Sequence, residues 1–497
     1  MRCFGVLSLL GLALKVTAEQ KVVVGYYVPW GKVAPEALPY DKVTHINYGF
    51  GVVYKRDDPT VIFIDRYYDG NKMRAIKKLA SAKGVKVLMS IGGWTGSQTF
   101  SLAARDPGLR AKLIDNLLVF VRKNTKPEWE TNPDGWDMDG IDLDWEYPGR
   151  AAAKCNVYAP EDSANYLLLL KELRAALDKE FPNDHKLITA AVRVKPFDGP
   201  DGKPMADVSA FAKYFDFINI MAYDIMGSWS NTIGPNAPFV ADTVKGGDSF
   251  SYTQGIDDWL AAGFPPSKLT AGLAFYGRTL TSTVDMNKTP TNMYQPKEGT
   301  TPKGDASDAN DPNFFCNEGS VYSGVYKYKY LRQDALSSPT TAMNGYTRHF
   351  DNITQTPWLF HAQSKKFISY DDPQSLQIKV TYAKKKNLRG VMYWDMAQDF
   401  NDELLDVAIQ IRNGANPQPT TTVPTSTPPT SSPSTTTVPT SPPVPTGSCQ
   451  PGQQKCVSEG TDPQYLLCLY GDWVPSSCAS GTVCRTTTGS QIFCDHP

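Results

Sequence analysis

The sequence predicts an α/β fold, a (β/α)8 TIM barrel followed by a small cysteine-rich module, on three observations. Short apolar, β-branched or aromatic runs recur eight times in the larger part of the chain, as is typical of parallel strands that are buried on both faces. Amphipathic, helix-like segments separate several of these runs. Six cysteines crowd into the end of the chain, as in small disulfide-linked domains. The predicted strands are residues 22–28, 44–50, 86–93, 140–147, 186–194, 217–224, 268–277 and 390–396.

Helices are predicted between the strands at residues 71–84, 109–123, 163–181 and 373–388. Alternating strands and helices form parallel βαβ units, and eight such units indicate a closed barrel. Active sites of this fold lie where the strands end. Polar residues at the ends of the predicted strands are therefore the first candidates for function.

One connection is too long for a simple barrel. The interval from Thr279 to Arg389 far exceeds a loop of about 2–6 residues plus one helix. Its end is the helix predicted at 373–388, so we expect residues of about 279–355 to form an inserted subdomain before the last strand. This subdomain would raise one wall of the active-site face.

The two ends of the chain differ from the barrel in composition. Residues 1–18 combine Arg2 with a short apolar stretch, which predicts a cleaved secretory signal, because a membrane span needs about 20 apolar residues. Every residue from Pro419 to Thr446 except three valines is Pro, Ser or Thr, which is typical of an extended linker. We therefore expect a signal peptide at 1–18, a catalytic domain at 19–413, a linker at 414–447 and a module at 448–497.

The cysteines fit a secreted, extracellular protein. The module holds six, which imply three disulfides of undetermined connectivity: Cys449, Cys456, Cys468, Cys478, Cys484 and Cys494. Cys155 and Cys316 either pair with each other or stay free. Sequons for N-glycosylation occur at Asn287 and Asn352.

Charge and histidine spacing exclude several partners. The formal net charge is −1, and the basic residues form no long run beyond Lys384–Lys386, so no nucleic acid or anionic membrane is predicted as a partner. The five histidines lack the spacing of metal ligands. We expect a monomer without a metal or cofactor.

Residues 139–147 read DGIDLDWEY, an unusual concentration of acids in a predicted strand. Side chains alternate along a strand, so Asp142, Asp144 and Glu146 share one face. Burial of neighbouring acids raises their pKa values, and a proton donor at mild pH needs a raised pKa. Glu146, close to the end of the strand, is therefore the candidate general acid of a glycosidase.

The other acids lie on the same side of the substrate as Glu146, whereas ordinary glycosidases place two carboxylates on either side of the scissile bond. A substrate-assisted route fits this arrangement, with an N-acetyl oxygen of the sugar as nucleophile. Asp144 would orient the acetamide N–H, and Asp142 would hold Asp144 and shift its titration. The sequence therefore predicts a retaining enzyme.

The motifs resemble those of family 18 glycoside hydrolases, the chitinases of the bacterial or class V type. DGIDLDWE resembles the family signature D-x-x-D-x-D-x-E. Residues 90–93, SIGG, resemble its S-x-G-G motif, residues 221–224, MAYD, its M-x-Y-D motif, and Trp394 its last-strand tryptophan. The likeness covers residues of about 20–410, and it implies that the insertion is an α+β subdomain that deepens the cleft.

The resemblance also implies roles for individual residues. Tyr223 would hydrogen-bond the acetamide carbonyl, Asp224 would bind and distort the sugar, and Trp394 would lie beneath it. Tyr26 and Ser90 would neighbour the inner aspartates. Further substrate contacts are predicted at Trp30, Gly92, Gly93, Trp94, Tyr147, Met221 and Arg278.

The C-terminal module resembles the fungal chitin-binding modules of family 19. Aromatic side chains among its cysteines would stack on sugar faces, with Trp473 and Tyr470 the predicted contacts. One or two of these aromatics could instead form the core of so small a domain.

The sequence thus predicts a secreted fungal chitinase, either free outside the cell or associated with the cell wall, that acts on chitin and chitooligosaccharides. A chitinase-like lectin would use the same barrel without turnover, but such proteins typically lack the catalytic Glu, which is present here as Glu146. An endo-β-N-acetylglucosaminidase shares the acid motif, but the insertion and the module argue against it. Endo or exo action and processivity stay open.

Overall fold

The computed structural model describes two parts of the chain. The described residues are 20–64, 66–126, 134–309, 316 and 322–413, followed by 453–462, 464–469, 472–477, 483–486 and 492–495. The chain divides after Ala415 into two compact units, which are described separately. The predicted signal peptide, the predicted linker and Tyr470 lie outside the described residues.

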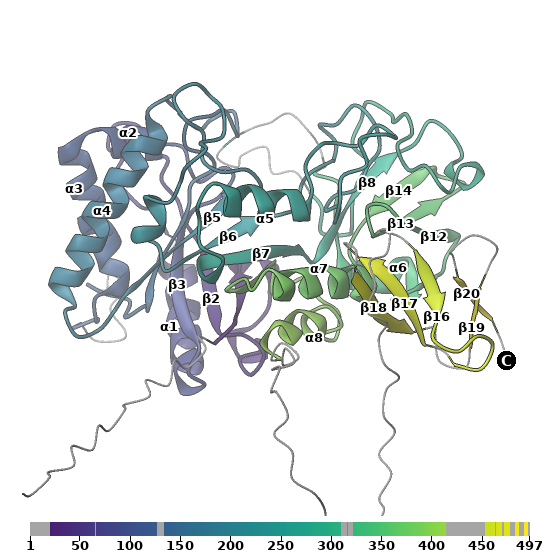
Figure 1. The fold of residues 1–497 in the computed structure, drawn as a ribbon. Coiled ribbons are helices and arrows are strands. Elements are labelled where there is room, and N and C mark those ends of the chain that lie inside the picture. Colours follow the sequence, from purple (N-terminus) through teal and green to yellow (C-terminus); the bar gives the residue numbers. More distant parts are fainter. Residues whose placement is uncertain are drawn as a thin grey trace, which may run out of the picture. The chain divides into compact units, whose positions relative to one another are not determined.

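The first unit contains a closed barrel of eight parallel strands within the described residues (Figure 1). The order around the barrel is β1-β15-β7-β6-β5-β4-β3-β2, which confirms the predicted fold and all eight strands. The strands are β1 Val22–Tyr27, β2 His45–Gly51, β3 Lys86–Gly92, β4 Gly140–Asp144, β5 Leu187–Arg193, β6 Phe217–Met221, β7 Leu269–Ala274 and β15 Gly390–Trp394.

Helices follow most of these strands. The four predicted ones are α1 Arg66–Ala82, α3 Pro107–Val121, α4 Asp162–Glu180 and α7 Pro373–Lys385, and α2 Phe100–Arg105, α5 Tyr252–Ala261 and α8 Leu405–Ala408 accompany them. Short 3-10 turns lie at Pro29–Gly31, Pro35–Ala37, Phe211–Lys213, Pro266–Lys268, Met286–Lys288 and Ile409–Arg412. Asp106 caps α3 by accepting from Leu109 N, and Asp372 closes a capping box at α7, so both helices begin where an acid precedes a proline.

Side chains along β4 and just beyond it alternate between the hydrophobic core and the interior of the barrel. Ile141, Leu143 and Trp145 join the core between the barrel and its helices, where the Trp145 ring stacks 5.3 Å from Phe100. Asp142 lies on the opposite face, inside the barrel, because it contacts side chains of β1, β3 and β5. The predicted strand at 140–147 is shortened to end at Asp144.

The insertion before the last barrel strand is an α+β subdomain, as predicted. Its antiparallel sheet has the order β12-β13-β14-β8-β9, with β8 Tyr276–Thr281, β9 Val325–Lys327, β12 Tyr346–Asp351, β13 Thr356–His361 and β14 Lys366–Ser369. The helix α6 Tyr328–Asp334 and the pair β10 Leu336–Ser338 and β11 Thr341–Ala342 complete it. The sheet extends beyond the predicted interval 279–355 at both ends, from Tyr276 to Ser369. It begins before residue 279 because the apolar run at 268–277 contains the end of the barrel strand β7 and the start of β8.

The second unit consists of short antiparallel strands. β16 Gln454–Cys456, β17 Gln464–Leu469 and β18 Asp472–Ser477 form one sheet, and β19 Val483–Thr486 pairs with β20 Ile492–Asp495. A disulfide joins Cys456 and Cys484. In the described parts of both units, no helix has the length and apolar character that a membrane crossing requires.

Candidate active site

Asp142 lies at the centre of a hydrogen-bonded cluster inside the barrel. Its carboxylate accepts from Tyr26 Oη at 2.8 Å, from Ser90 Oγ at 2.7 Å and from Thr189 Oγ1 at 2.5 Å. The side chain is fully buried, and burial raises the pKa of Asp142 although these hydroxyl donors and Asn47 lower it. Donors from three strands, β1, β3 and β5, therefore fix this carboxyl group in one orientation.

Asp144 lies at the end of β4 and differs from Asp142 in its partners. Its side chain is 3% exposed, yet Oδ1 has no hydrogen-bond partner among the described residues. Burial, with the charges of Glu146 and Asp142, holds the pKa of Asp144 well above its usual range. A buried oxygen without a donor is costly, so this position is suited to accept a hydrogen bond from a ligand.

Glu146 follows two residues later, just beyond the strand. Its backbone N–H donates to Ser97 Oγ at 3.2 Å, and the Ser97 hydroxyl lies 2.9 Å from the carbonyl oxygen of Asp144. Burial raises the pKa of Glu146 to about 8, and the charge of Asp224 adds to the rise, while a hydrogen bond from Tyr147 lowers it. The carboxyl group is thus protonated at neutral pH and able to act as an acid.

Tyr223 and Asp224 follow β6 at the same end of the barrel. Tyr223 is 8% exposed, and its pKa is raised by burial and by the charges of Asp144, Asp224 and Glu146. Asp224 is exposed and pairs with Arg278, whose Nε donates to Oδ1 at 2.8 Å. The Asp224 N–H donates to Asn236 Oδ1 at 3.2 Å. An ion pair and a backbone contact therefore orient Asp224.

Aromatic rings surround the acids. Trp394 lies 5.5 Å from the Tyr26 ring and stacks on Phe50 at 5.9 Å, with an interplanar angle of 16°. Trp30 lies 6.3 Å from Phe50 and is 56% exposed, and Trp94 is 45% exposed. Flat, partly exposed rings beside hydrogen-bonding acids are suited to bind a sugar, which has both apolar faces and hydroxyl edges.

Gly92 and Gly93 support the backbone of the site. A Cβ at Gly92 would lie 2.1 Å from the Asp144 carbonyl oxygen, and Gly93 N donates to the same oxygen at 2.8 Å. Both have positive φ, 115° and 84°. The close approach of β3 to β4 therefore requires glycine at both positions. The remaining predicted contact on a barrel strand, Met221, is half-buried at the end of β6.

The structure places Asp144, Glu146, Tyr223, Asp224 and Trp394 at the carboxyl ends of barrel strands or just beyond them, and Arg278 on β8 of the insertion sheet; their roles stay predictions. The side chain of Trp473 lies outside the described residues, although its backbone belongs to β18. Sequence reasoning missed Asn47, Ser97 and Thr189, and also Asn156, whose Nδ2 donates to the Glu146 oxygen. It also missed Trp229, an exposed ring 5.0 Å from the guanidinium of Arg278. A lone polar residue in an apolar strand was the available signal for Asn47 and Thr189.

The chain matches Glycosyl hydrolases family 18 over residues 22–399 and Carbohydrate binding domain (family 19) over residues 423–490. A chitinase-like effector of Moniliophthora roreri is 32% identical over 432 residues, which cover 82% of this chain and 96% of that protein. Endochitinase 1 of Metarhizium robertsii is 27% identical over 422 residues, 78% of this chain and 86% of that protein. The crystal structure of a chitinase from Rhizomucor miehei aligns with a TM-score of 0.68 and 30% identity, covering 79% of this chain and all of that one.

The protein belongs to glycosyl hydrolases family 18 and carries a family 19 carbohydrate-binding domain. It is a glycoside hydrolase of the chitinase type, which confirms the resemblance and the enzyme class predicted from the motifs.

Proposed function

We propose that this chitinase hydrolyses β-1,4-linked N-acetylglucosamine polymers with retention, by a substrate-assisted mechanism. The observation that carries the proposal is the pair of Asp144 and Glu146 on one side of the site, with Asp144 Oδ1 buried and lacking a partner among the described residues. A neutral Glu146 donates a proton to the leaving oxygen. The acetamide oxygen of the substrate then attacks the anomeric carbon, so no second enzyme carboxylate is needed opposite the first.

Asp144 stabilises the intermediate of this reaction. Its free oxygen accepts the acetamide N–H while the acetamide carbon becomes positively charged, and the Tyr223 hydroxyl binds the acetamide oxygen. Asp142, held by three hydroxyls, fixes the position and charge of Asp144. Glu146, now ionised, deprotonates the water that opens the intermediate. Proton nuclear magnetic resonance of the first products of chitotetraose hydrolysis tests retention, because an initial α-anomer would contradict it.

Sugar binding is assigned to the surrounding side chains. Trp394 forms the floor under the distorted sugar, and Asp224, held by Arg278, binds its hydroxyls. Exposed Trp30 and Trp94 extend the apolar surface toward neighbouring sugars, together with Tyr147. The family 19 domain binds chitin, with Trp473 and Tyr470 as its contacts.

We further propose an extracellular protein with a signal peptide at 1–18 and a linker at 414–447. Two observations support this location: a carbohydrate-binding domain, whose insoluble ligand lies outside cells, and two disulfides within the described residues, which persist in oxidising compartments.

A second candidate function is chitin binding without turnover. Two relatives are named chitinase-like effectors. Glu146, Asp144 and Tyr223 are all present in this chain, which favours turnover. Products formed by the wild-type protein from chitooligosaccharides of defined length separate the two functions, and their lengths separate endo from exo action.

The pH profile of kcat/KM should report the ionisation of Glu146. Because the acid must be protonated, and burial raises its pKa from 4.5 to about 8, we expect kcat/KM to fall about tenfold per pH unit above about pH 8. Initial rates on a soluble oligomer measure the profile, with circular dichroism confirming the fold at each pH. A basic limb near pH 4.5 would contradict a neutral Glu146.

Deleting residues 415–497 should separate catalysis from attachment. The first unit contains its own core and all proposed catalytic residues, so turnover of soluble oligomers should stay within about twofold of the full chain. Hydrolysis of crystalline chitin should fall severalfold, because tethering raises the local concentration only at an insoluble surface. Equal losses on both substrates would indicate a structural role for the tail.

A further inference from the structure

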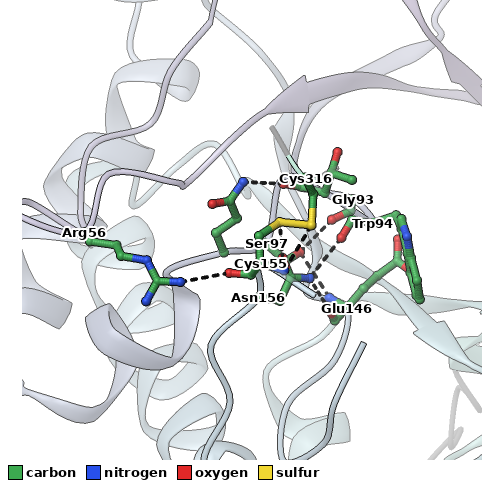
Figure 2. The surroundings of a disulfide bond; sticks show 10 residues. Arg56, Gly93, Trp94, Ser97, Glu146, Cys155, Asn156 and Cys316 are labelled. Carbon is green, nitrogen blue, oxygen red and sulfur yellow. Dashed lines mark hydrogen bonds between the residues drawn. A yellow bond between two sulfur atoms is a disulfide. The ribbon is translucent and has the colours of Figure 1, made fainter. Parts of the chain in front are cut away.

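One side-chain amide links the proposed acid to a neighbouring loop. Asn156 Nδ2 donates to the backbone oxygen of Glu146 at 2.8 Å and to that of Trp94 at 2.9 Å. Figure 2 shows Asn156 between these two residues. Glu146 follows β4 and Trp94 follows β3, so a single NH2 group uses both of its protons to join two loops of the active-site face.

The segment around Asn156 is irregular, because α4 begins only at Asp162, and contacts from several elements hold it. Cys155 forms a disulfide with Cys316 of the insertion. Arg56 Nη2 donates to the Cys155 oxygen at 3.2 Å, and Val157 N donates to the Gln98 oxygen at 3.0 Å. The disulfide is the covalent member of this set, and it adjoins Asn156 directly (Figure 2).

We propose that Asn156 is a positioning residue that fixes the backbone of Glu146 relative to that of Trp94, and that the Cys155–Cys316 disulfide holds Asn156 in place for this task. The inference rests on the proposed function, in which Glu146 donates the proton and Trp94 contacts a neighbouring sugar. A sugar chain held by Trp94 then presents its scissile oxygen at a set distance from the acid. Small displacements of a catalytic group are costly, up to about 100-fold for 1 Å.

The first test compares Asn156→Ala and Asn156→Asp with the wild type. Alanine removes both hydrogen bonds, and aspartate keeps the shape but cannot donate to the two carbonyl oxygens when ionised. Both should lower kcat for a soluble oligomer about tenfold. Aspartate is the nearly isosteric variant, so it decides the outcome if the alanine variant fails to fold. Wild-type kcat in a folded Asn156→Asp protein would overturn the proposal.

The control is Asn116→Ala. Asn116 Nδ2 donates to the Thr60 oxygen at 2.8 Å, a bond of the same type and length that joins α3 to the segment before α1. This variant should retain wild-type kcat and the wild-type pH profile. A tenfold loss of kcat in Asn116→Ala as well as in Asn156→Ala would show that loss of any such hydrogen bond has this effect. It would overturn a specific role for Asn156.

The pH profile of kcat/KM distinguishes a residue that positions Glu146 from one that only stabilises the fold. The ionisable groups that face Glu146 are Asp144, Tyr147, Tyr223 and Asp224, and the Asn156 variants leave all of them in place. A looser loop admits water, which reduces the burial that keeps the acid protonated. The basic limb of kcat/KM should therefore move to lower pH in Asn156→Ala and stay unchanged in Asn116→Ala. An unshifted limb would contradict the proposal.

A double-mutant cycle tests the role of the disulfide. Cys155→Ser combined with Cys316→Ser should lower kcat about threefold, in the same direction as Asn156→Ala. If the disulfide acts through Asn156, adding both serines to Asn156→Ala should cause almost no further loss. Losses that multiply would show that the disulfide acts independently and would overturn this part of the inference.

Binding provides a readout that does not depend on turnover. In a Glu146→Gln background, Asn156→Ala should weaken the affinity for chitotetraose about threefold to tenfold, because Trp94 is no longer held, whereas Asn116→Ala should not. Unchanged affinity would overturn the proposal. If the wild-type protein releases no products, the proposed function fails, and this binding comparison still decides the role of Asn156.

Discussion

Glu146→Gln is expected to reduce turnover of soluble chitooligosaccharides by about 10²–10⁴-fold or more, the usual contribution of a general acid–base group. The amide has almost the same shape as the protonated carboxyl group, so the buried position beside Tyr147 still accommodates it. It supplies no proton to the leaving oxygen and accepts none from water. Single-turnover and steady-state rates at the optimum pH of the wild type measure the loss.

Binding and a matched substitution serve as controls for this variant. Affinity for chitotetraose should persist, because the aromatic rings and Asp144 are unchanged. Glu161→Gln makes the same chemical change at an exposed residue just before α4 and should retain wild-type rates. Turnover by Glu146→Gln within tenfold of the wild type would contradict the assignment of the acid, and loss of binding would point to a damaged fold.

The barrel could be predicted because its strands follow one physical rule. Buried parallel strands read as continuous apolar runs between amphipathic helices, and each of the eight runs became a barrel strand. The rule also explains where prediction was inaccurate. The run at 268–277 continues as apolar and aromatic residues on both sides of Ala274, so nothing there marks the change from the barrel to the insertion sheet.

The acids of the site could be predicted because charged residues in an apolar strand are rare and costly. Asp142 and Asp144 stand out in that way, whereas their partners do not. Thr189 and Asn47 are ordinary residues on other strands. Pairing of β4 with β5 places Thr189 opposite Asp142, and Asn47 lies on β2, two strands away, so only assembly of the sheet brings them beside Asp142. Asn156 lies in an irregular connection without periodicity, so its contacts with two loops depend on the folded backbone alone.

An oligomer with 2-hydroxyl in place of 2-acetamido at the cleavage-site sugar is expected to be cleaved at that bond at least about 10³-fold more slowly than the acetylated oligomer. The change removes the proposed nucleophile, whose attachment to the reacting sugar supplies most of the rate. It also removes the N–H that would donate a hydrogen bond to Asp144 Oδ1. This oxygen is buried and has no partner among the described residues. A free amine at the same position should block cleavage too, but its positive charge pairs with Asp144, so the neutral hydroxyl gives the clearer result.

Placement of the change within the oligomer separates mechanism from binding. The same hydroxyl one sugar further along, on the leaving side of the bond, leaves the nucleophile intact, so cleavage should stay within about tenfold of the fully acetylated oligomer. Rates at saturating oligomer measure both cases, because they exclude the loss of affinity. If the cleavage-site variant reacts as fast as the leaving-side variant, the acetamide is not the nucleophile. An enzyme group must then attack from the face opposite Glu146, where ordinary retaining enzymes place their second carboxylate. The slow reaction is expected because Asp144, at the end of β4, and Glu146, just beyond it, approach the sugar from the same side, and burial raises the pKa of both.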